Sequence, residues 1–226
     1  MKRSEINTYI REALDIFAFH HFNLPVWCHW TLEEWKQNKS KCDEIFVANL
    51  GWDITDFGSG DYEKRGLFLV TLRNGVLPDY TKPYAEKIMI VKENQETFLH
   101  YHWKKQEDII NRAGGILVME LYGVGEDDGP VVQDIMVQID GVETLVEKGS
   151  FVHLHPGQSI TMSRGVYHRF YAKEGSGYVL AGEVSSPNDD DGDNRFFEDL
   201  GRFPLVEEDE EPLRLMIPDY KKFLAL

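Results

Sequence analysis

The chain has 226 residues, of which 42% are hydrophobic and 28% are charged, and this length and balance predict one globular domain with a substantial core. The formal net charge of −15 disfavours nucleic acid and anionic membranes as partners. Two cysteines form no disulfide framework, and neither a signal peptide nor a long apolar span is recognised, so we expect a cytoplasmic protein.

Residues 1–44 are predicted to form a helical segment that packs on the main body. Apolar residues recur at three- and four-residue steps at Ile6, Ile10, Ala13, Leu14 and Phe17. Ser4 is the expected N-cap of this first helix. A second helix is predicted to begin at Thr31, because Thr31 and Glu34 have the spacing of a capping box.

Residues 45–200 have the pattern of a β-barrel. Strands are predicted at 65–75, 87–91, 96–103, 115–123, 134–139, 142–147, 150–154, 158–162, 167–172 and 177–184. Asn74-Gly75 and Asp140-Gly141 are typical hairpin turns. Many short strands with regular turns indicate a sandwich or barrel. The segment 107–113 is interpreted as irregular or half a helix.

Residues 201–226 are predicted to form a C-terminal extension. Its last part, PLRLMIPDYKKFLAL, is apolar enough to dock on the body or on a partner subunit. The acidic run 207–211, EEDEE, is interpreted as solvated.

One stretch and one distant histidine predict a metal site. His100 and His102 share a face of their strand, because side chains alternate between the two faces. Glu107 follows at a distance that lets the chain turn and bring a carboxylate to the same ion, and His168 would complete the set. Three imidazoles and one carboxylate suit Mn, Fe, Co, Ni or Zn, and spacing does not choose among them.

These residues resemble the two cupin motifs. The first motif, HxH–x4–E–x6–G, is complete from His100 to Gly114, although Asn94 stands where a glycine is usual. The second, PxGxxH, matches residues 163–168 with Ser163 in place of proline. The resemblance implies a mainly β fold, the cupin double-stranded β-helix or jelly-roll barrel, with the N-terminal helical segment added to it.

A wider set of stretches resembles the D-lyxose isomerase family. They run in the expected order from about Gly51 to Phe196 and include GWDITDFGSGD, YAEKIMIV, HYHWKKQEDIINRAGG, YHRF and GEVSSPNDD. The resemblance implies a metal-dependent cupin sugar isomerase, commonly with Mn(II) and usually a homodimer. It implies interconversion of D-lyxose and D-xylulose, with D-mannose and D-fructose as a second pair, and it implies that the three histidines and the glutamate named above are the metal ligands.

The other polar residues near these ligands suit a polyhydroxylated substrate and proton transfer. Glu183 lies on an apolar strand, where burial would raise the pKa of its carboxyl, and is the predicted base between C1 and C2. Lys105 is predicted to stabilise the oxyanion or to shuttle the hydroxyl proton. Asp193, placed with these catalytic residues, is expected with Arg195 to hold the distal hydroxyls. The predicted substrate-binding residues are Lys87, Gln95 and Arg195.

The residues alone leave three functions open. The first is the aldose–ketose isomerase, in which the metal chelates O1 and O2 of the sugar and a proton moves through an enediol. These residues do not exclude a hydride shift between the two carbons. The second is an Fe(II)-dependent cupin dioxygenase, and the third is a non-catalytic sugar-binding cupin.

Overall fold

The computed structural model describes residues 1–76, 82–189, 192–198 and 204–225. Its helices are α1 (Arg3–Phe19), α2 (Leu32–Asn38), α3 (Asp43–Val47) and α4 (Asp219–Leu224). Its strands are β1 (Gly51–Thr55), β2 (Leu67–Arg73), β3 (Ala85–Val91), β4 (His100–His102), β5 (Glu107–Gly114), β6 (Leu117–Val124), β7 (Pro130–Val131), β8 (Ile135–Ile139), β9 (Val142–Val146), β10 (Phe151–Leu154), β11 (Ser159–Met162), β12 (Tyr167–Ala172), β13 (Val179–Ser185) and β14 (Asn194–Phe196).

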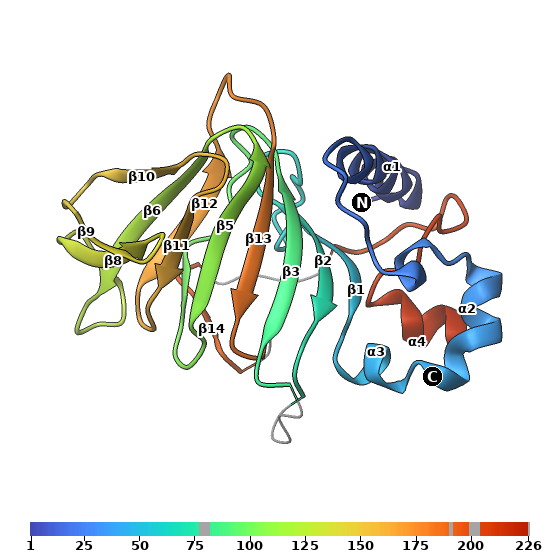
Figure 1. Cartoon of the computed structure of the whole chain (residues 1–226). Coiled ribbons are helices and arrows are strands. Elements are labelled where there is room, and N and C mark those ends of the chain that lie inside the picture. The colour runs from blue at the N-terminus through green and yellow to red at the C-terminus, as the bar shows by residue number, and fades with distance from the viewer. Residues whose placement is uncertain (77–81, 190–191, 199–203, 226) are drawn as a thin grey trace.

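Two curled antiparallel sheets make the body of the molecule (Figure 1). The larger has the strand order β1-β2-β3-β13-β5-β11-β8-β9, and the smaller has β10-β6-β12-β4-β14, with β7 paired to β6. The helices gather beside β1 and β2 at one side of the larger sheet (Figure 1). This arrangement is a mainly β, double-stranded β-helix or jelly-roll barrel with an N-terminal helical segment, and it confirms the predicted fold class.

The larger sheet is covered on both faces, and its strands alternate accordingly. In β3, Met89 and Val91 belong to the apolar core inside the barrel, whereas Ile88 and Ile90 belong to the core under α1. Lys87 lies two residues before Met89 on β3, so strand alternation places both side chains on the face that points into the barrel. A buried polar side chain on an inward position of this sheet therefore faces the barrel interior.

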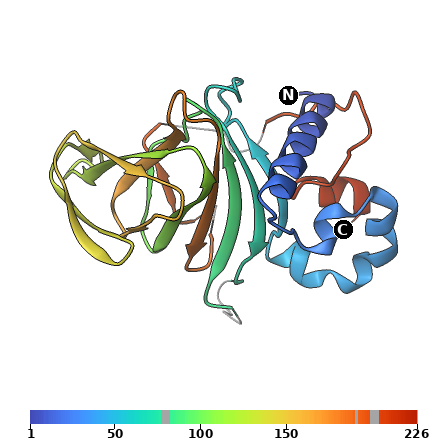
Figure 2. The same cartoon turned by 45° about the horizontal axis from the view of Figure 1, so that its top comes forward.

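Helix α1 lies along the outer face of the sheet with the C-terminal segment beside it (Figure 2). Its buried side chains include the predicted Ile6, Ile10, Ala13 and Phe17. The expected cap is wrong: Lys2 is the N-cap, and its backbone N–H donates to Glu5, whereas the Ser4 hydroxyl donates to Asp209. The predicted capping box at Thr31 and Glu34 is confirmed at the start of α2.

The acidic run 207–211 is exposed to solvent, as expected, but it is also bonded to α1. The Arg3 guanidinium donates to both carboxylate oxygens of Glu208, each at 2.8 Å, and Asn7 donates to Glu210 at 3.0 Å. These contacts tie the C-terminal segment to α1. The predicted boundary after residue 200 lies outside the described residues, and the one between residues 44 and 45 falls within α3.

Two expectations about strands and turns are wrong. The segment 107–113 belongs to β5, which lies between β13 and β11 in the larger sheet. Its polar Asn111 obscures the strand pattern, yet this side chain is fully buried and donates to the carbonyls of Gly115 and Leu154. Asn74-Gly75 is no tight hairpin turn, because β3 begins only at Ala85 and neither residue has the required positive φ.

The turn at Asp140-Gly141 between β8 and β9 is confirmed, since both residues have positive φ, 50° and 78°. Within the described residues, no helix is long and apolar enough to cross a membrane.

Candidate active site

A cavity of about 310 Å³ lies inside the barrel and is lined from both sheets. Histidines from β4 and β12 lie on one side of it, and Lys87 and Glu183 come from β3 and β13. Aromatic side chains, including Phe57, Phe170 and Phe196, add an apolar wall. The cavity therefore joins a polar, ionisable surface to an apolar one, as binding sites for small molecules commonly do.

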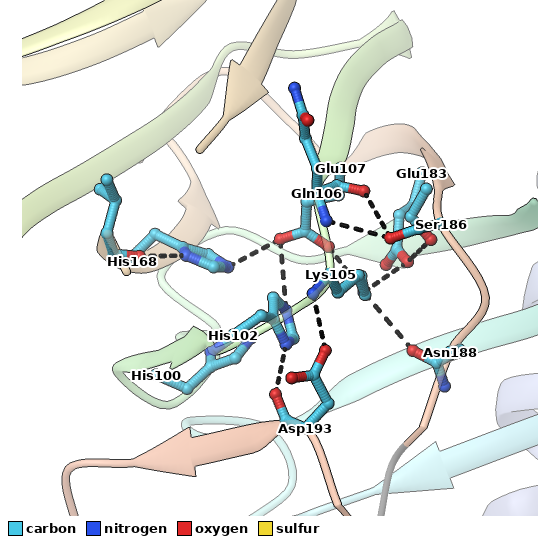
Figure 3. A network of polar contacts seen from close by, with 12 residues as sticks. His100, His102, Lys105, Gln106, Glu107, His168, Glu183, Ser186, Asn188 and Asp193 are labelled. Atoms are coloured by element: carbon cyan, nitrogen blue, oxygen red, sulfur yellow. Dashed lines mark hydrogen bonds and ion pairs between the residues drawn. The ribbon is translucent and has the colours of Figure 1, made fainter. Parts of the chain in front are cut away.

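Three histidines converge at this cavity (Figure 3). His100 and His168 are direct partners in the pairing of β4 with β12, and His102 lies two residues along the same strand face. One nitrogen of each ring lies within 4.8 Å of the others. The geometry predicted from strand alternation is therefore present, and a metal ion could be held between these three side chains.

The backbone fixes which nitrogen of each ring faces the cluster. Nδ1 of His100, His102 and His168 donates to a backbone carbonyl oxygen, at 2.8, 3.1 and 3.0 Å respectively. A carbonyl oxygen only accepts, so the proton sits on Nδ1 and the lone pair of Nε2 is left for a ligand. Burial, and then the two neighbouring histidines, lower the pKa of His100 well below its usual range, which keeps the imidazole neutral.

Glu107, the first residue of β5, lies against this cluster. Its Oε1 is 2.9 Å from Nε2 of His168 and 3.5 Å from Nε2 of His102. Burial alone would raise the pKa of the Glu107 carboxyl, but the Lys105 ammonium holds it well below its usual range. Glu107 is therefore an ionised carboxylate beside the imidazoles.

This donor set fits a divalent cation. Nε2 of His102 is buried and makes no hydrogen bond with any residue that the structure describes, which is costly unless another group binds it. Neutral imidazole nitrogens with one ionised carboxylate suit Mn, Fe, Co, Ni or Zn.

A second cluster of charges adjoins the first through Lys105 (Figure 3). The Lys105 ammonium lies 2.7 Å from Glu107 and 2.7 Å from Glu183, and the Lys87 ammonium lies 3.3 Å from Glu183. The oxygen Oδ1 of Asn188 accepts hydrogen bonds from Lys87 at 2.9 Å and Lys105 at 3.4 Å. Two lysines, two glutamates and one amide thus form a continuous network along the cavity.

The charge state of Glu183 differs from the expectation. Burial would raise the pKa of its carboxyl, but the ammonium groups of Lys105 and Lys87 lower it below its usual range. The pKa of Lys105 is raised in turn, because Glu107 and Glu183 outweigh the effect of burial. Glu183 is therefore ionised at neutral pH and Lys105 is protonated.

Asp193 lies against β4, which carries His100 and His102, and against the two lysines that follow it. Its carboxylate accepts the backbone N–H of Lys104 at 2.8 Å and of Lys105 at 2.7 Å, and its carbonyl accepts Nδ1–H of His102. Asp193 is not among the residues that line the cavity in the described part of the chain. Its contacts hold the backbone of the site, so the expected contact with substrate hydroxyls is not supported by its position.

Gln95 and Arg195 are not brought to the cavity. The Gln95 amide is fully buried and donates to the carbonyl of Tyr62 at 2.6 Å. Arg195 lies between the cavity-lining Asn194 and Phe196 on β14, so strand alternation turns it outward. Its guanidinium donates to Asp128 at 2.8 Å on the surface.

Sequence reasoning missed several cavity residues. Asp53 and Thr55 line the cavity from β1, and Asn188 lines it from the segment after β13. A signal for the first two was present, because GWDIT alternates apolar residues, which pack toward α1, with polar ones. Asn188 has no comparable signal, since it lies in a loop.

The chain matches the family model described as D-lyxose isomerase over residues 1–220. A D-lyxose/D-mannose isomerase from Serratia proteamaculans is 43% identical over 228 residues, covering 100% of both chains. A D-lyxose/D-mannose isomerase from Escherichia coli O157:H7 is 43% identical over 226 residues, covering 99% of this chain and 100% of that one.

Two solved structures share the fold. L-ribose isomerase from Cellulomonas parahominis, with no ligand, gives a TM-score of 0.60 at 16% identity over 92% of this chain and 98% of that chain. L-ribose isomerase from Acinetobacter sp. DL28, in complex with L-ribose, gives 0.57 at 15% identity over 88% of this chain and 93% of that chain.

Proposed function

Because the chain belongs to the D-lyxose isomerase family and is a sugar isomerase, we propose that it interconverts D-lyxose with D-xylulose, and D-mannose with D-fructose. Two relatives that carry both sugars in their names cover the whole chain or nearly all of it. The observation that carries the proposal is the position of Glu183, whose ionised carboxylate lines the same cavity as the three histidines.

The cofactor in this proposal is one Mn(II) ion, held by His100, His102, Glu107 and His168. Co, Zn, Fe and Ni are the alternatives that this donor set accepts. When bound, the ion would supply Lewis-acid chemistry that polarises the carbonyl of the open-chain sugar.

Glu183 is the proposed base. Its carboxylate takes the proton from C2 of the aldose, which leaves an enediolate. The carboxyl group exchanges this proton with solvent and then gives a proton to C1, which yields the ketose. Lys105 binds Glu183 at 2.7 Å and faces the same cavity, so its ammonium can donate to the oxygen on which negative charge develops. Moving that hydrogen bond from Glu183 to the sugar oxygen makes Glu183 more basic when it accepts the proton.

The remaining proton moves from O2 to O1. We propose that Lys105 carries it, giving one proton to O1 and taking one from O2, so that it is an ammonium again at the end of the turnover. Lys87 lies opposite Glu183 in the pairing of β3 with β13 and orients the carboxylate throughout. The apolar wall of Phe57, Phe170 and Phe196 limits the access of water to the enediolate.

The decisive experiment is to load the protein with Mn(II), add D-lyxose and measure D-xylulose. Formation of the ketose is expected. Oxygen uptake without ketose would favour the dioxygenase, and sugar binding without any product would favour a non-catalytic cupin. The matched control is His102→Ala, which should lose bound metal and turnover together.

The route of hydrogen transfer is tested in deuterium oxide. Transfer through Glu183 should place solvent deuterium at C1 of the product, whereas a hydride shift would leave the substrate hydrogen there. Retention of the substrate hydrogen in nearly all product would contradict the role of Glu183 as the base.

We also propose a cytoplasmic homodimer. Cys28 and Cys42 are buried free thiols, which suits a reducing compartment. Val142 and Leu145 of β9 are 65% and 53% exposed, and such apolar side chains favour contact with a second copy. Light scattering of the purified protein should give the mass of a dimer, and a monomer at micromolar concentration would contradict this.

A further inference from the structure

Asn188 holds a position between the two lysines of the cavity. Its Oδ1 accepts a hydrogen bond from Lys87 at 2.9 Å and one from Lys105 at 3.4 Å. Both ammonium groups also lie against the same oxygen of Glu183, at 3.3 and 2.7 Å. A neutral acceptor at this point lets two like charges approach one carboxylate without adding a charge of its own.

The backbone of Asn188 is held from the other side by one buried side chain. Oδ1 of Asn74 accepts the N–H of Asn188 at 2.8 Å, and Nδ2 of Asn74 donates to its carbonyl at 3.3 Å. The same Nδ2 donates to the carbonyl of Ala48 at 3.3 Å. The Asn74 carboxamide thus binds both the N–H and the carbonyl of Asn188, which lies 114 positions away along the chain. We call this pair of hydrogen bonds the clamp.

Neighbouring contacts hold the same segment against the loop before β5. The N–H of Ser186 donates to the carbonyl of Gln106 at 3.0 Å, and the N–H of Gln106 donates to Oγ of Ser186 at 3.1 Å. These bonds fix where the segment starts. The two bonds from Asn74 hold the backbone of Asn188 itself, whose side-chain oxygen accepts hydrogen bonds from both lysines.

We propose that Asn74 is a positioning residue of the active site, which acts through Asn188 to place the Lys87 and Lys105 ammonium groups against Glu183. This inference rests on the proposed function, because it assigns a purpose to the placement of the base. Asn74 does not line the cavity in the described part of the chain, so it acts without touching the sugar. Loss of the clamp should slow turnover more than it weakens sugar binding.

The test compares Asn74→Ala with a matched control. Asn7 makes the same kind of clamp far from the cavity, because it accepts the N–H of Leu213 at 2.8 Å and donates to the carbonyl of Glu211 at 2.9 Å. Both asparagines are buried. Asn7→Ala therefore loses equivalent bonds, and it should leave kcat within about twofold of the wild type.

For Asn74→Ala, kcat should fall by about 10- to 100-fold, the scale of a displaced catalytic group, while KM changes by less than about threefold. Asn188→Ala should give a similar loss. The double variant should be no slower than the slower single variant, because both act on one pathway. If Asn74→Ala does not fold, Asn74→Asp, which keeps the acceptor for the Asn188 N–H, should show a smaller loss of the same kind.

Three results would overturn the proposal: kcat near the wild-type value in Asn74→Ala, an equal loss in Asn7→Ala, or multiplied losses in the double variant. A wild-type protein with no isomerase activity would refute the proposed function instead. In that case amide hydrogen exchange still tests the clamp. The backbone N–H of Asn188 should exchange its hydrogen faster in Asn74→Ala than in Asn7→Ala, and equal exchange rates would refute the clamp itself.

Discussion

In two networks of the described residues, a buried cation joins two carboxylates. In the cavity, Lys105 lies between Glu107 and Glu183. At the chain ends, Arg3 lies between Glu208 and Asp219 with a fully buried side chain. Each network joins segments that are distant in the sequence, and each has a cation whose pKa is raised by its carboxylates.

The geometry of the two cations separates their roles. Arg3 is bidentate to both partners, with four hydrogen bonds of 2.7 to 2.8 Å that fix the guanidinium and both carboxylates. Lys105 makes one short contact with each glutamate and lies at the cavity surface. A point charge on a flexible stem can change partners during a reaction, whereas the planar fork cannot. The Arg3 network therefore stabilises the fold, and the Lys105 network serves the chemistry.

The largest effect that we expect from a substitution in either network is the loss of kcat at Glu183. Glu183→Gln keeps the shape of the side chain but removes the base, so kcat should fall by about 10²- to 10⁴-fold with bound metal retained. Product formation and metal content are measured on the same sample. Glu208→Gln is the control from the other network and should turn over normally. A near-normal kcat in Glu183→Gln would remove the catalytic role from this residue.

At Arg3 we expect a loss of stability without a loss of turnover. Arg3→Met leaves the carboxylate of Asp219 buried without its charge partner, which should cost about 3 to 5 kcal/mol in the free energy of unfolding. Below the unfolding temperature, kcat should stay near the wild-type value. Urea unfolding and the isomerase assay together check this. Normal stability would show that the network is dispensable, and a specific loss of kcat would show that the two networks are coupled.

A smaller effect is expected when Arg3 becomes lysine. Arg3→Lys keeps the charge but cannot be bidentate to Glu208 and Asp219 at once, so at least one charged hydrogen bond is lost. The expected cost is about 1.5 to 3 kcal/mol, the range for a hydrogen bond to a charged group. If Arg3→Lys is as stable as the wild type in urea, charge alone holds the chain ends and the fork has no special role.

The sequence predicts the placement of the histidines more easily than the charge states of the residues around them. His100 and His102 are related by strand alternation within three residues, which local sequence reveals. The charge state of Glu183 depends instead on Lys105, which lies 78 residues away in the sequence, and on Lys87, its partner in the pairing of β13 with β3. The tertiary fold sets both contacts, and no local pattern encodes them. For the same reason a carboxyl expected to have a raised pKa has a lowered one.

Long-range pairing also explains the other differences. The acidic run 207–211 has the composition of a solvated loop, and it is tied to the fold by Arg3, Ser4 and Asn7, which lie more than 200 residues away. The Asn74-Gly75 pair has the composition of a hairpin turn, yet the Asn74 side chain binds the backbone of Asn188. In both cases the partner of a polar side chain lies too far along the chain for sequence spacing to identify it.

The smallest expected effect is the pH dependence of the terminal network. The hydrogen bond from Arg3 lowers the pKa of Glu208 from 4.5 to about 2. Glu208 therefore contributes stability above pH 4.5, and this contribution is lost as the pH falls from 4.5 toward 2. Because the side chain is 26% exposed, we expect only about 1 to 2 kcal/mol after solvent screening. In urea unfolding, the difference between wild type and Glu208→Gln should be constant from pH 6 to 8 and should shrink below pH 4.5. A difference that does not change down to pH 3 would mean that the carboxylate of Glu208 is not what joins the chain ends, leaving Asp219 as the partner that holds Arg3.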